Sequence, residues 1–265
     1  MSEANNPNSS LKSMFQFKQF TIHQDRTAMK VGPDGVLLGA WAPIDPNASR
    51  ILDIGTGTGL IALMIAQRFS KQSPNQRAEM INSQLNIDAI DIDKNSIEQA
   101  AENIASSPFA EYITTHHTSL QDHNPEANYD AIVCNPPYFV ASLKCPDTAR
   151  TKARHTDSLS FYDLLEHSAR LLNSGGSLSI VLPVNEGNQL IELALKYGFT
   201  LTHLTEVHPT PTAPPKRLLL QFVIQNSQLN HSSLLISHSS LTIEIARHQY
   251  TPEYIALTRD FYLKM

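Results

Sequence analysis

An apolar run and a glycine-rich loop meet in the stretch Arg50-Ile51-Leu52-Asp53-Ile54-Gly55-Thr56-Gly57-Thr58-Gly59, and a second apolar run begins directly after it at Leu60. The residues before the glycines predict a strand over 50–54, and those after them predict a helix over 60–69. Glycines at such a junction let the backbone turn sharply and let a ligand approach without meeting a Cβ atom. In an open parallel sheet, ligands bind beyond the carboxyl ends of the strands, which is where this loop would lie.

Strands and helices alternate after this loop. The pattern predicts strands at 87–92, 112–117, 129–134 and 177–182, helices at 94–104, 159–172 and 186–197, and a turn at Gly175-Gly176. Such alternation implies a parallel sheet that is covered by helices on both faces. The segments 201–207 and 217–225 then indicate two strands joined by a Pro-rich turn, so we expect an antiparallel end to the sheet. A strand at 241–245 and a helix at 252–263 would close the chain.

The chain before residue 49 is expected to lie outside this α/β core. Residues 1–12 are rich in Asn and Ser and are predicted to be disordered. Residues 13–48 form a lead-in segment with short extended pieces and a helix at 36–41, and residues 49–265 form the main domain. The polar stretch 70–86 is interpreted as a surface insertion.

Composition excludes several classes of protein. The chain has 265 residues, of which 41% are hydrophobic and 17% charged, as in a globular protein with a full core. No apolar run approaches the about 18 residues of a membrane span, and no signal peptide is evident, so we expect a cytoplasmic protein. Cys134 and Cys145 have no partners at zinc-like spacing, and we expect neither a metal site nor a disulfide. The net charge of −5 argues against general coating of nucleic acid but leaves local contacts open.

The glycine loop departs from the dinucleotide fingerprint Gly-x-Gly-x-x-Gly because Leu60 occupies its sixth position, which counts against a nicotinamide-dependent dehydrogenase. Its spacing resembles instead the first motif of class I S-adenosylmethionine (SAM)-dependent methyltransferases. That resemblance implies a class I fold: a mostly parallel seven-stranded sheet with an antiparallel end. It also implies that Asp53, Gly55 and Gly57 bind SAM, whose ammonium group needs a carboxylate.

Three further residues extend the expected cofactor site. Asp91, at the end of the predicted strand 87–92, can accept hydrogen bonds from both ribose hydroxyls, whereas Asp93 reads as the N-cap of the next helix. Members of the family usually place another aspartate after the third strand, near the adenine amino group. Here Ser119 and Leu120 occupy that place, with Asp122 close by, and we expect Ser119 and Leu120 in the adenine pocket.

The tetrapeptide Asn135-Pro136-Pro137-Tyr138 follows the predicted strand 129–134 and resembles the catalytic motif of methyltransferases that act on planar amino nitrogens. Such a nitrogen is a poor nucleophile because its lone pair is delocalised. The side-chain oxygen of Asn135 and the carbonyl of Pro136 can each accept one N–H hydrogen bond, which orients the nitrogen and favours a pyramidal geometry. The prolines stiffen the loop, and Tyr138 can stack on the substrate. The chemistry requires no metal.

The tetrapeptide is shared by adenine-N6, cytosine-N4 and glutamine-N5 enzymes, so other stretches must narrow the substrate. Several of them resemble the bacterial tRNA1(Val) adenine-37 N6-methyltransferase family over roughly residues 15–263: 15–20, 29–41, 135–139, 153–156 and 260–263. The insertion at 70–86 is a departure. The resemblance implies methylation of adenine 37 in the anticodon loop, with the base drawn out of its stack. Arg150, Lys152 and Arg154 would contact phosphates, and we expect a monomer.

Two alternatives remain open. A glutamine-N5 protein methyltransferase would be expected to carry a substantial N-terminal recognition domain, and only about 45 residues precede the core here. A non-catalytic RNA-binding protein that keeps a SAM pocket is the second alternative. The intact tetrapeptide at Asn135 and the intact glycine loop at Asp53 count against it.

Overall fold

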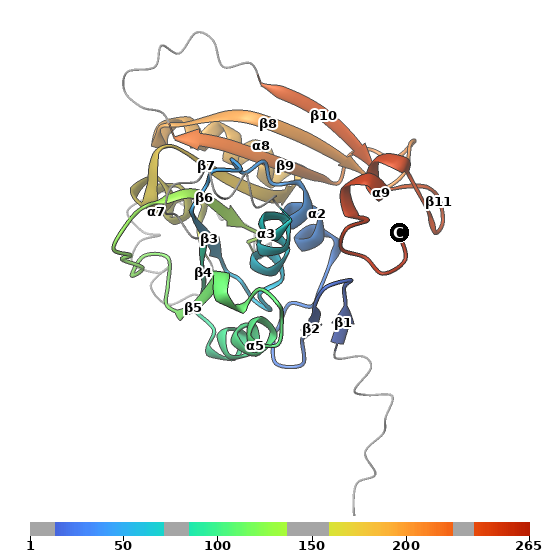
Figure 1. Ribbon diagram of the computed structural model, residues 1–265. Helices are drawn as coiled ribbons and strands as arrows, with labels where there is room; N and C mark the ends of the chain where they lie inside the picture. The colour runs from blue at the N-terminus through green and yellow to red at the C-terminus, as the bar shows by residue number, and fades with distance from the viewer. Residues whose placement is uncertain (1–13, 72–84, 137–158, 225–235) are drawn as a thin grey trace, which may run out of the picture.

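A computed structural model describes residues 14–71, 85–136, 159–224 and 236–265 of the chain (Figure 1). One large sheet runs through the molecule in the strand order β10-β8-β9-β7-β6-β3-β4-β5. The strands are β3 (Arg50–Ile54), β4 (Asn86–Asp91), β5 (Ile113–His117), β6 (Tyr129–Cys134), β7 (Leu172–Pro183), β8 (Phe199–His208), β9 (Arg217–Ile224) and β10 (Ser237–Thr242).

Strands β5, β4, β3, β6 and β7 pair in parallel, whereas β9 is antiparallel to both β7 and β8. The prediction of a mostly parallel sheet with an antiparallel end is therefore confirmed. The seven strands predicted for the sheet correspond to β3–β9, and β10, which overlaps the strand expected at 241–245 only at its end, pairs in parallel with β8 as an eighth strand at the edge. The parallel strands all end at one edge of the sheet, which we call the carboxyl edge.

Helices cover both faces of the sheet, as predicted (Figure 1). On one face lie α2 (Pro33–Trp41), α3 (Leu60–Ser70), α5 (Lys94–Ala105) and α9 (Pro252–Thr258), whose apolar side chains share one buried cluster. On the other face lie α7 (Phe161–Leu171) and α8 (Val184–Ala194), which pack into a second cluster. Nine of the eleven residues of α3 are buried, because this helix is apolar on all sides and is covered by α2.

The lead-in segment packs into the first of these clusters. A hairpin of β1 (Met14–Gln16) and β2 (Thr21–His23) places Phe17 against Tyr262, with ring centroids 5.9 Å apart. The amide of Lys18 donates to the carbonyl of Phe261 at 2.8 Å. The start of the described chain is thereby fixed to its end.

Three sequence-based expectations are corrected. The strand expected at 241–245 is two elements, because the chain leaves the large sheet after Thr242 and β11 (Glu244–Ala246) pairs with β12 (Gln249–Tyr250). The closing helix ends at Thr258 rather than 263, since the amide of Phe261 turns back to the carbonyl of Thr258. The predicted turn at Gly175-Gly176 lies inside β7, where a register shift against β6 accommodates it.

Other expectations fall outside the described residues: the disorder of 1–12 and the character of most of the insertion 70–86. Within the part of the chain that the structure describes, no helix combines the length and the apolar character that crossing a bilayer requires.

The bulge in β7 gives a test of the sheet. A Cβ atom at Gly176 would lie 2.9 Å from the carbonyl oxygen of Asn173 and 3.2 Å from that of Asp130, and backbone cannot move aside easily. We expect Gly176→Ala to lower the free energy of unfolding by about 1–3 kcal/mol, as overpacking does. Urea unfolding measures the change. Ser174→Ala, at an exposed neighbour, should stay within about 0.5 kcal/mol of wild type, and an equal loss in both variants would contradict the steric explanation.

Candidate functional site

The glycine loop turns at the carboxyl edge between β3 and α3. Gly55, Gly57 and Gly59 have φ angles of 67°, 57° and 81°, a left-handed region that other residues rarely adopt. A Cβ atom built on Gly55 would meet no described atom within 4 Å. The loop thus presents bare backbone to an open space, and the amide of Thr56 ties it to the carbonyl of Ile90 in β4 at 3.0 Å.

Asp53 lies fully buried beneath this loop. Its Oδ2 accepts hydrogen bonds from the Thr56 hydroxyl at 2.7 Å and from the Ala62 amide at 3.2 Å. Its Oδ1 is buried and has no partner among the described residues. Burial raises the pKa of Asp53 to about 7, and the neighbouring charge of Asp91 adds to the increase. The orphaned oxygen marks a place where a cationic group would stabilise the ionised carboxylate.

Asp91 ends β4 beside the loop. Its Oδ2 accepts the amide of Gly57 at 2.9 Å and its Oδ1 accepts the amide of Asp93 at 2.9 Å. Burial raises the pKa of Asp91 above its ordinary value. Asp93 caps α5 by accepting the amide of Asn95, which confirms its predicted structural role. Ile92, between the two aspartates, is 51% exposed and offers an apolar surface next to Asp91.

Ser119 and Leu120 lie in the turn that follows β5. The amide of Thr118 donates to the carbonyl of Asp91 at 3.1 Å, which holds this turn against the end of β4. Leu120 is buried, whereas the Ser119 hydroxyl is engaged with the exposed Asp122. The structure therefore brings the turn to the same edge as Asp53 and Asp91.

Asn135 and Pro136 follow β6, the strand that pairs directly with β3. Ile54 pairs with Cys134, so Asn135 and Gly55 leave the sheet at the same level, from neighbouring strands that lie about 4.8 Å apart in the hydrogen-bonding direction. The Oδ1 atom of Asn135 is buried and has no partner among the described residues. Two unpartnered acceptors, one on Asp53 and one on Asn135, thus lie on adjacent strands at the carboxyl edge.

Helix α2 lies against this edge through its glycines. A Cβ atom at Gly35 would lie 3.8 Å from Nδ2 of Asn135 and 3.2 Å from Leu60. The later turns of α2 are buried against α3. Because Gly39 has no Cβ atom, the backbone of α2 can lie close to the side chain of Met64 in α3. Helix α2 therefore packs closely against Asn135 and limits the space on that side of its side chain.

Some of the predicted site residues lie outside the described residues: Tyr138, Arg150, Lys152 and Arg154, as well as Cys145. The remaining ones gather at the carboxyl edge: Asp53, Gly55, Gly57, Asp91, Ser119, Leu120, Asn135 and Pro136. Sequence reasoning missed Thr56 and Ile92. The exposed apolar residue between two aspartates at a strand end is the signal that could have found Ile92. Among the residues described, no group of three or more His, Cys, Asp or Glu side chains is arranged to hold a metal ion.

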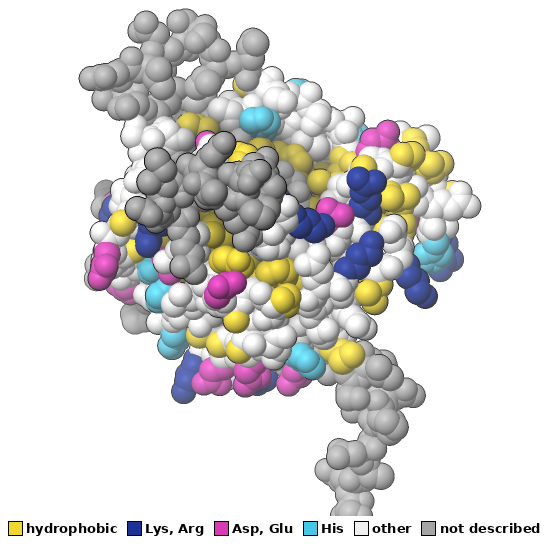
Figure 2. Space-filling model, in the orientation of Figure 1, with side chains coloured by type: hydrophobic (Ala, Val, Ile, Leu, Met, Phe, Trp, Pro, Cys, Tyr) yellow, Lys and Arg dark blue, Asp and Glu magenta, His cyan; other side chains and the backbone are white. Residues whose placement is uncertain are grey.

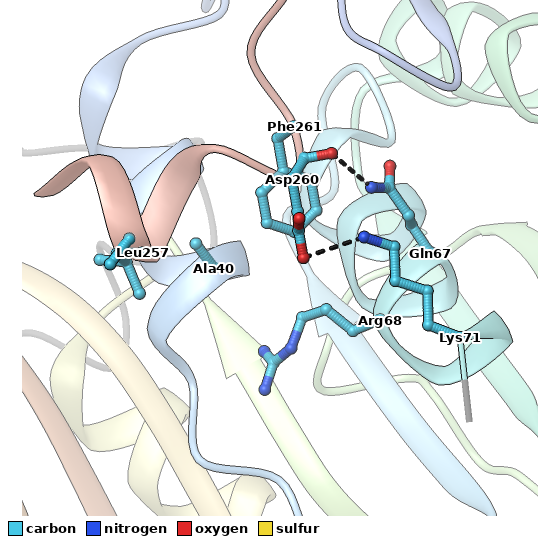
Figure 3. Close-up of a pocket in the computed structure, with 8 residues that line it drawn as sticks. Ala40, Gln67, Arg68, Lys71, Leu257, Asp260 and Phe261 are labelled. Atoms are coloured by element: carbon cyan, nitrogen blue, oxygen red, sulfur yellow. Dashed lines mark hydrogen bonds and ion pairs between the residues drawn. The ribbon is translucent and has the colours of Figure 1, made fainter. Parts of the chain in front are cut away.

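A cavity of about 300 Å³ lies elsewhere, at the opposite end of α3 from the glycine loop. Figure 3 shows Lys71 paired with Asp260, 2.9 Å apart, and Gln67 donating to the carbonyl of Asp260 at this cavity. Because α3 is eleven residues long, about 16 Å separates its two ends, and the cavity does not belong to the candidate site.

Comparison with known proteins gives a consistent family. The model of the methyltransferase small domain matches residues 37–205. The tRNA1(Val) (adenine(37)-N6)-methyltransferase of Parabacteroides distasonis is 50% identical over 254 residues, covering 95% of this chain and 98% of that protein. The proteins of the same name from Phocaeicola vulgatus and Trichodesmium erythraeum are 45% and 43% identical, with 95% of this chain and 98% of each relative covered.

Solved structures agree on the fold. A protein of Agrobacterium tumefaciens described as a predicted O-methyltransferase superimposes with a TM-score of 0.59 at 17% identity, over 86% of this chain and 96% of that chain. A Listeria monocytogenes protein assigned to the class I S-adenosylmethionine-dependent methyltransferases gives 0.54 at 14% identity, over 78% and 62% of the two chains. At these identities the likeness shows the fold alone.

The raised pKa of Asp53 predicts how stability depends on pH. In the folded state the pKa is about 7, above the ordinary value of 3.8, so between these values the folded protein keeps a proton that the unfolded chain has released. The stability that this group contributes is therefore present below about pH 4 and is lost as the pH rises through about 7. Asp53→Asn should remove the loss, whose steepest slope is about 1.4 kcal/mol per pH unit.

The measurement is urea unfolding of both proteins at about pH 5 and about pH 8. Other carboxylates titrate in both proteins, so the difference between wild type and Asp53→Asn isolates Asp53. A difference that is independent of pH would contradict the burial argument.

Proposed function

The chain belongs to the family of tRNA1(Val) (adenine(37)-N6)-methyltransferases, and we propose that it transfers a methyl group from SAM to N6 of adenine 37 in the anticodon loop of tRNA1(Val). The observation that carries the proposal is the buried Oδ1 of Asn135, which has no partner in the described part of the chain and lies next to the glycine loop at the carboxyl edge. We further expect the chain to act as a monomer in the cytoplasm.

The residues of the glycine loop fit SAM. The free Oδ1 of Asp53 can receive the ammonium group, directly or through a water molecule, and this contact would stabilise the ionised carboxylate. Gly55 and Gly57 leave the backbone bare where the ligand passes. The oxygens of Asp91 keep lone pairs for the two ribose hydroxyls while its amide bonds hold the carboxylate still. Ile92 would cover the adenine ring on one side.

When bound, SAM supplies an electrophilic methyl group on a sulfonium. The substrate's amino nitrogen must then be presented with its lone pair directed at that methyl group. Asn135 accepts one N–H of the nitrogen through Oδ1, and Pro136 accepts the other through its carbonyl, so that both bonds favour the pyramidal geometry of the transition state. No side-chain base is required, because the methylated nitrogen is positively charged and releases its proton readily.

The substrate is proposed from the family and from the charges of the chain. A base that is stacked in a loop must be drawn out before Asn135 can reach its amino group, and Tyr138 would then stack on it. Arg150, Lys152 and Arg154 would contact the phosphates on either side. Figure 2 shows further Lys and Arg side chains over α2, α9 and the C-terminal segment, whereas acidic side chains gather over α5. Arg217 is paired with Asp34 at 3.0 Å.

Replacing the acceptor tests the mechanism. We expect Asn135→Ala to bind SAM normally and to lower the rate of methyl transfer at least about a hundredfold, the loss that follows removal of one positioned group from a transition state. Tyr138→Ala should also slow the reaction, through lost stacking worth about 1–3 kcal/mol. Transfer of labelled methyl groups to tRNA, followed by nucleoside mass spectrometry, measures both the rate and the product.

The controls separate the chemistry from the substrate. Asn173→Ala removes an exposed amide far along β7 and should leave the rate unchanged. Near-normal turnover by Asn135→Ala would refute the mechanism. Labelled glutamine in a release factor, with no label in tRNA, would refute the RNA substrate and leave the role of the tetrapeptide standing.

Neutralising the basic cluster tests the RNA contacts. The combined change Arg150→Gln, Lys152→Gln and Arg154→Gln should weaken tRNA binding and flatten its dependence on salt, because fewer counterions are released. The affinity for SAM should stay the same. Lys196→Gln, at an exposed position before β8 on the opposite edge of the sheet, is the matched control. An unchanged slope of log affinity against log salt in the triple variant would remove these residues from the interface.

A further inference from the structure

The cavity at the end of α3 opposite the glycine loop has more positive than negative charge in its lining. Among the described residues that line it, Arg68 and Lys71 are cationic and Asp260 is the single carboxylate. That carboxylate is already paired with Lys71 at 2.9 Å. Figure 3 shows the apolar side chains of Ala40 and Leu257 on one side of the cavity and Lys71 on the other, with Arg68 extending from α3 between them.

Arg68 carries a charge that no carboxylate in the described part of the chain neutralises. Its guanidinium donates to the carbonyls of Gly39 and Ala42, at 3.0 and 2.8 Å, where α2 ends. These bonds use two of its five N–H donors. A helix C-terminus carries a partial charge of roughly −0.5, so α2 offsets only part of the guanidinium's charge. Burial lowers the pKa of Arg68, and an anion in the cavity would therefore stabilise the charged form.

Two further cations lie near the pair of Lys71 and Asp260. The hydrogen bond from Lys71 lowers the pKa of Asp260, and the charges of Lys71, Arg259 and Lys18 add to the decrease. The ammonium group of Lys18 donates to the carbonyls of Arg259 and Met265. Together with the guanidinium that caps α2, four cations thus lie at this end of α3 around one carboxylate. The local potential favours a ligand with negative charge.

The size and the lining of the cavity fit a phosphate group that carries a sugar. Its volume of about 300 Å³ is at the lower limit of small-molecule sites. A water molecule occupies roughly 30 Å³, so the space holds more than the five heavy atoms of a bare phosphate. Arginine binds phosphate through a planar fork of donors, and lysine binds it as a point charge. The side chains of Ala40 and Leu257 offer an apolar surface for the sugar.

We propose that this cavity is a phosphate-binding site, in which Arg68 and Lys71 donate to the phosphate oxygens of a nucleotide. A free nucleotide and the backbone of a bound tRNA carry the same group. The site is distinct from the cofactor site, because the length of α3, about 16 Å, separates the two. Binding of phosphate here does not depend on methyl transfer.

Cytidine 5′-monophosphate (CMP) is the probe for the free ligand, since a pyrimidine nucleotide is a poor competitor for an adenine pocket. By calorimetry, Lys71→Gln should bind CMP at least about tenfold more weakly than wild type, because a charge-assisted hydrogen bond is lost. Arg68→Lys, which keeps the charge and removes the fork of donors, should weaken binding too. If Arg68→Lys fails to fold, Lys71→Gln decides, because Lys71 is largely exposed at the end of α3.

Lys94→Gln is the matched control. Lys94 is also an exposed lysine with one carboxylate partner, Glu98 at 3.7 Å, but it lies in α5 among acidic side chains. This variant should bind CMP as wild type does. An equal loss in Lys94→Gln and Lys71→Gln would overturn the proposal, because it would assign the effect to the general charge of the surface.

An unmodified tRNA1(Val) transcript is the probe for the second source. If its backbone occupies the cavity, Lys71→Gln should reduce the slope of log affinity against log salt by about 1, as one lost phosphate contact does. The transcript should then also prevent CMP from binding. A reduced slope without CMP binding assigns the site to RNA alone, whereas weakened CMP binding with an unchanged slope assigns it to a free nucleotide.

The proposal is overturned if neither variant of the cavity weakens CMP binding and the slope for the transcript stays the same. A wild-type protein that binds no tRNA would refute the proposed function. In that case the CMP measurements with Lys71→Gln and Lys94→Gln still decide whether the cavity binds phosphate.

Discussion

The pairing of β3 with β6 at the centre of the sheet is the constraint on which the rest of the structure depends. Ile54 and Cys134 are register partners, so the loop after β3 and the residues after β6 emerge side by side. This pairing is the point at which the strand order reverses, where parallel sheets leave a crevice. Cofactor residues and acceptor residues, about 80 positions apart in sequence, become neighbours because two adjacent strands end at the same level.

A shared electrostatic feature follows from that arrangement. Asp53 and Asn135 each keep one buried oxygen that has no partner among the described residues, and unpaired buried acceptors cost free energy in the absence of a ligand. Two such atoms on neighbouring strands indicate an edge that is organised for binding rather than for stability. The protein offsets the cost elsewhere, through two apolar clusters that cover both faces of the sheet.

Elements whose signal is local could be predicted from the sequence. The bounds of β3 and β6 agree with the prediction, because each is a short apolar run that is followed within two residues by glycine or proline. The positions of Asp53 and Asp91 at the carboxyl edge could be predicted because each aspartate lies within the last two residues of a predicted strand. The bulge at Gly175 and the edge strand β10 could not, since both depend on pairing with a distant strand. The sequence motif also does not show which group the Ser119 hydroxyl bonds. In the structure that hydroxyl donates to the carboxylate of Asp122.

The contact between Phe17 and Tyr262 has a consequence for how the protein is made. Almost the whole chain separates the two rings, and a ribosome releases the first long before the second. The face of Phe17 that packs on Tyr262 must therefore stay uncovered until the segment around Tyr262 has been synthesised. Such contacts between distant residues form late and slowly. Synthesis of this protein thus passes through an interval in which all eight strands of the large sheet have been made while one aromatic face of the lead-in segment is still exposed.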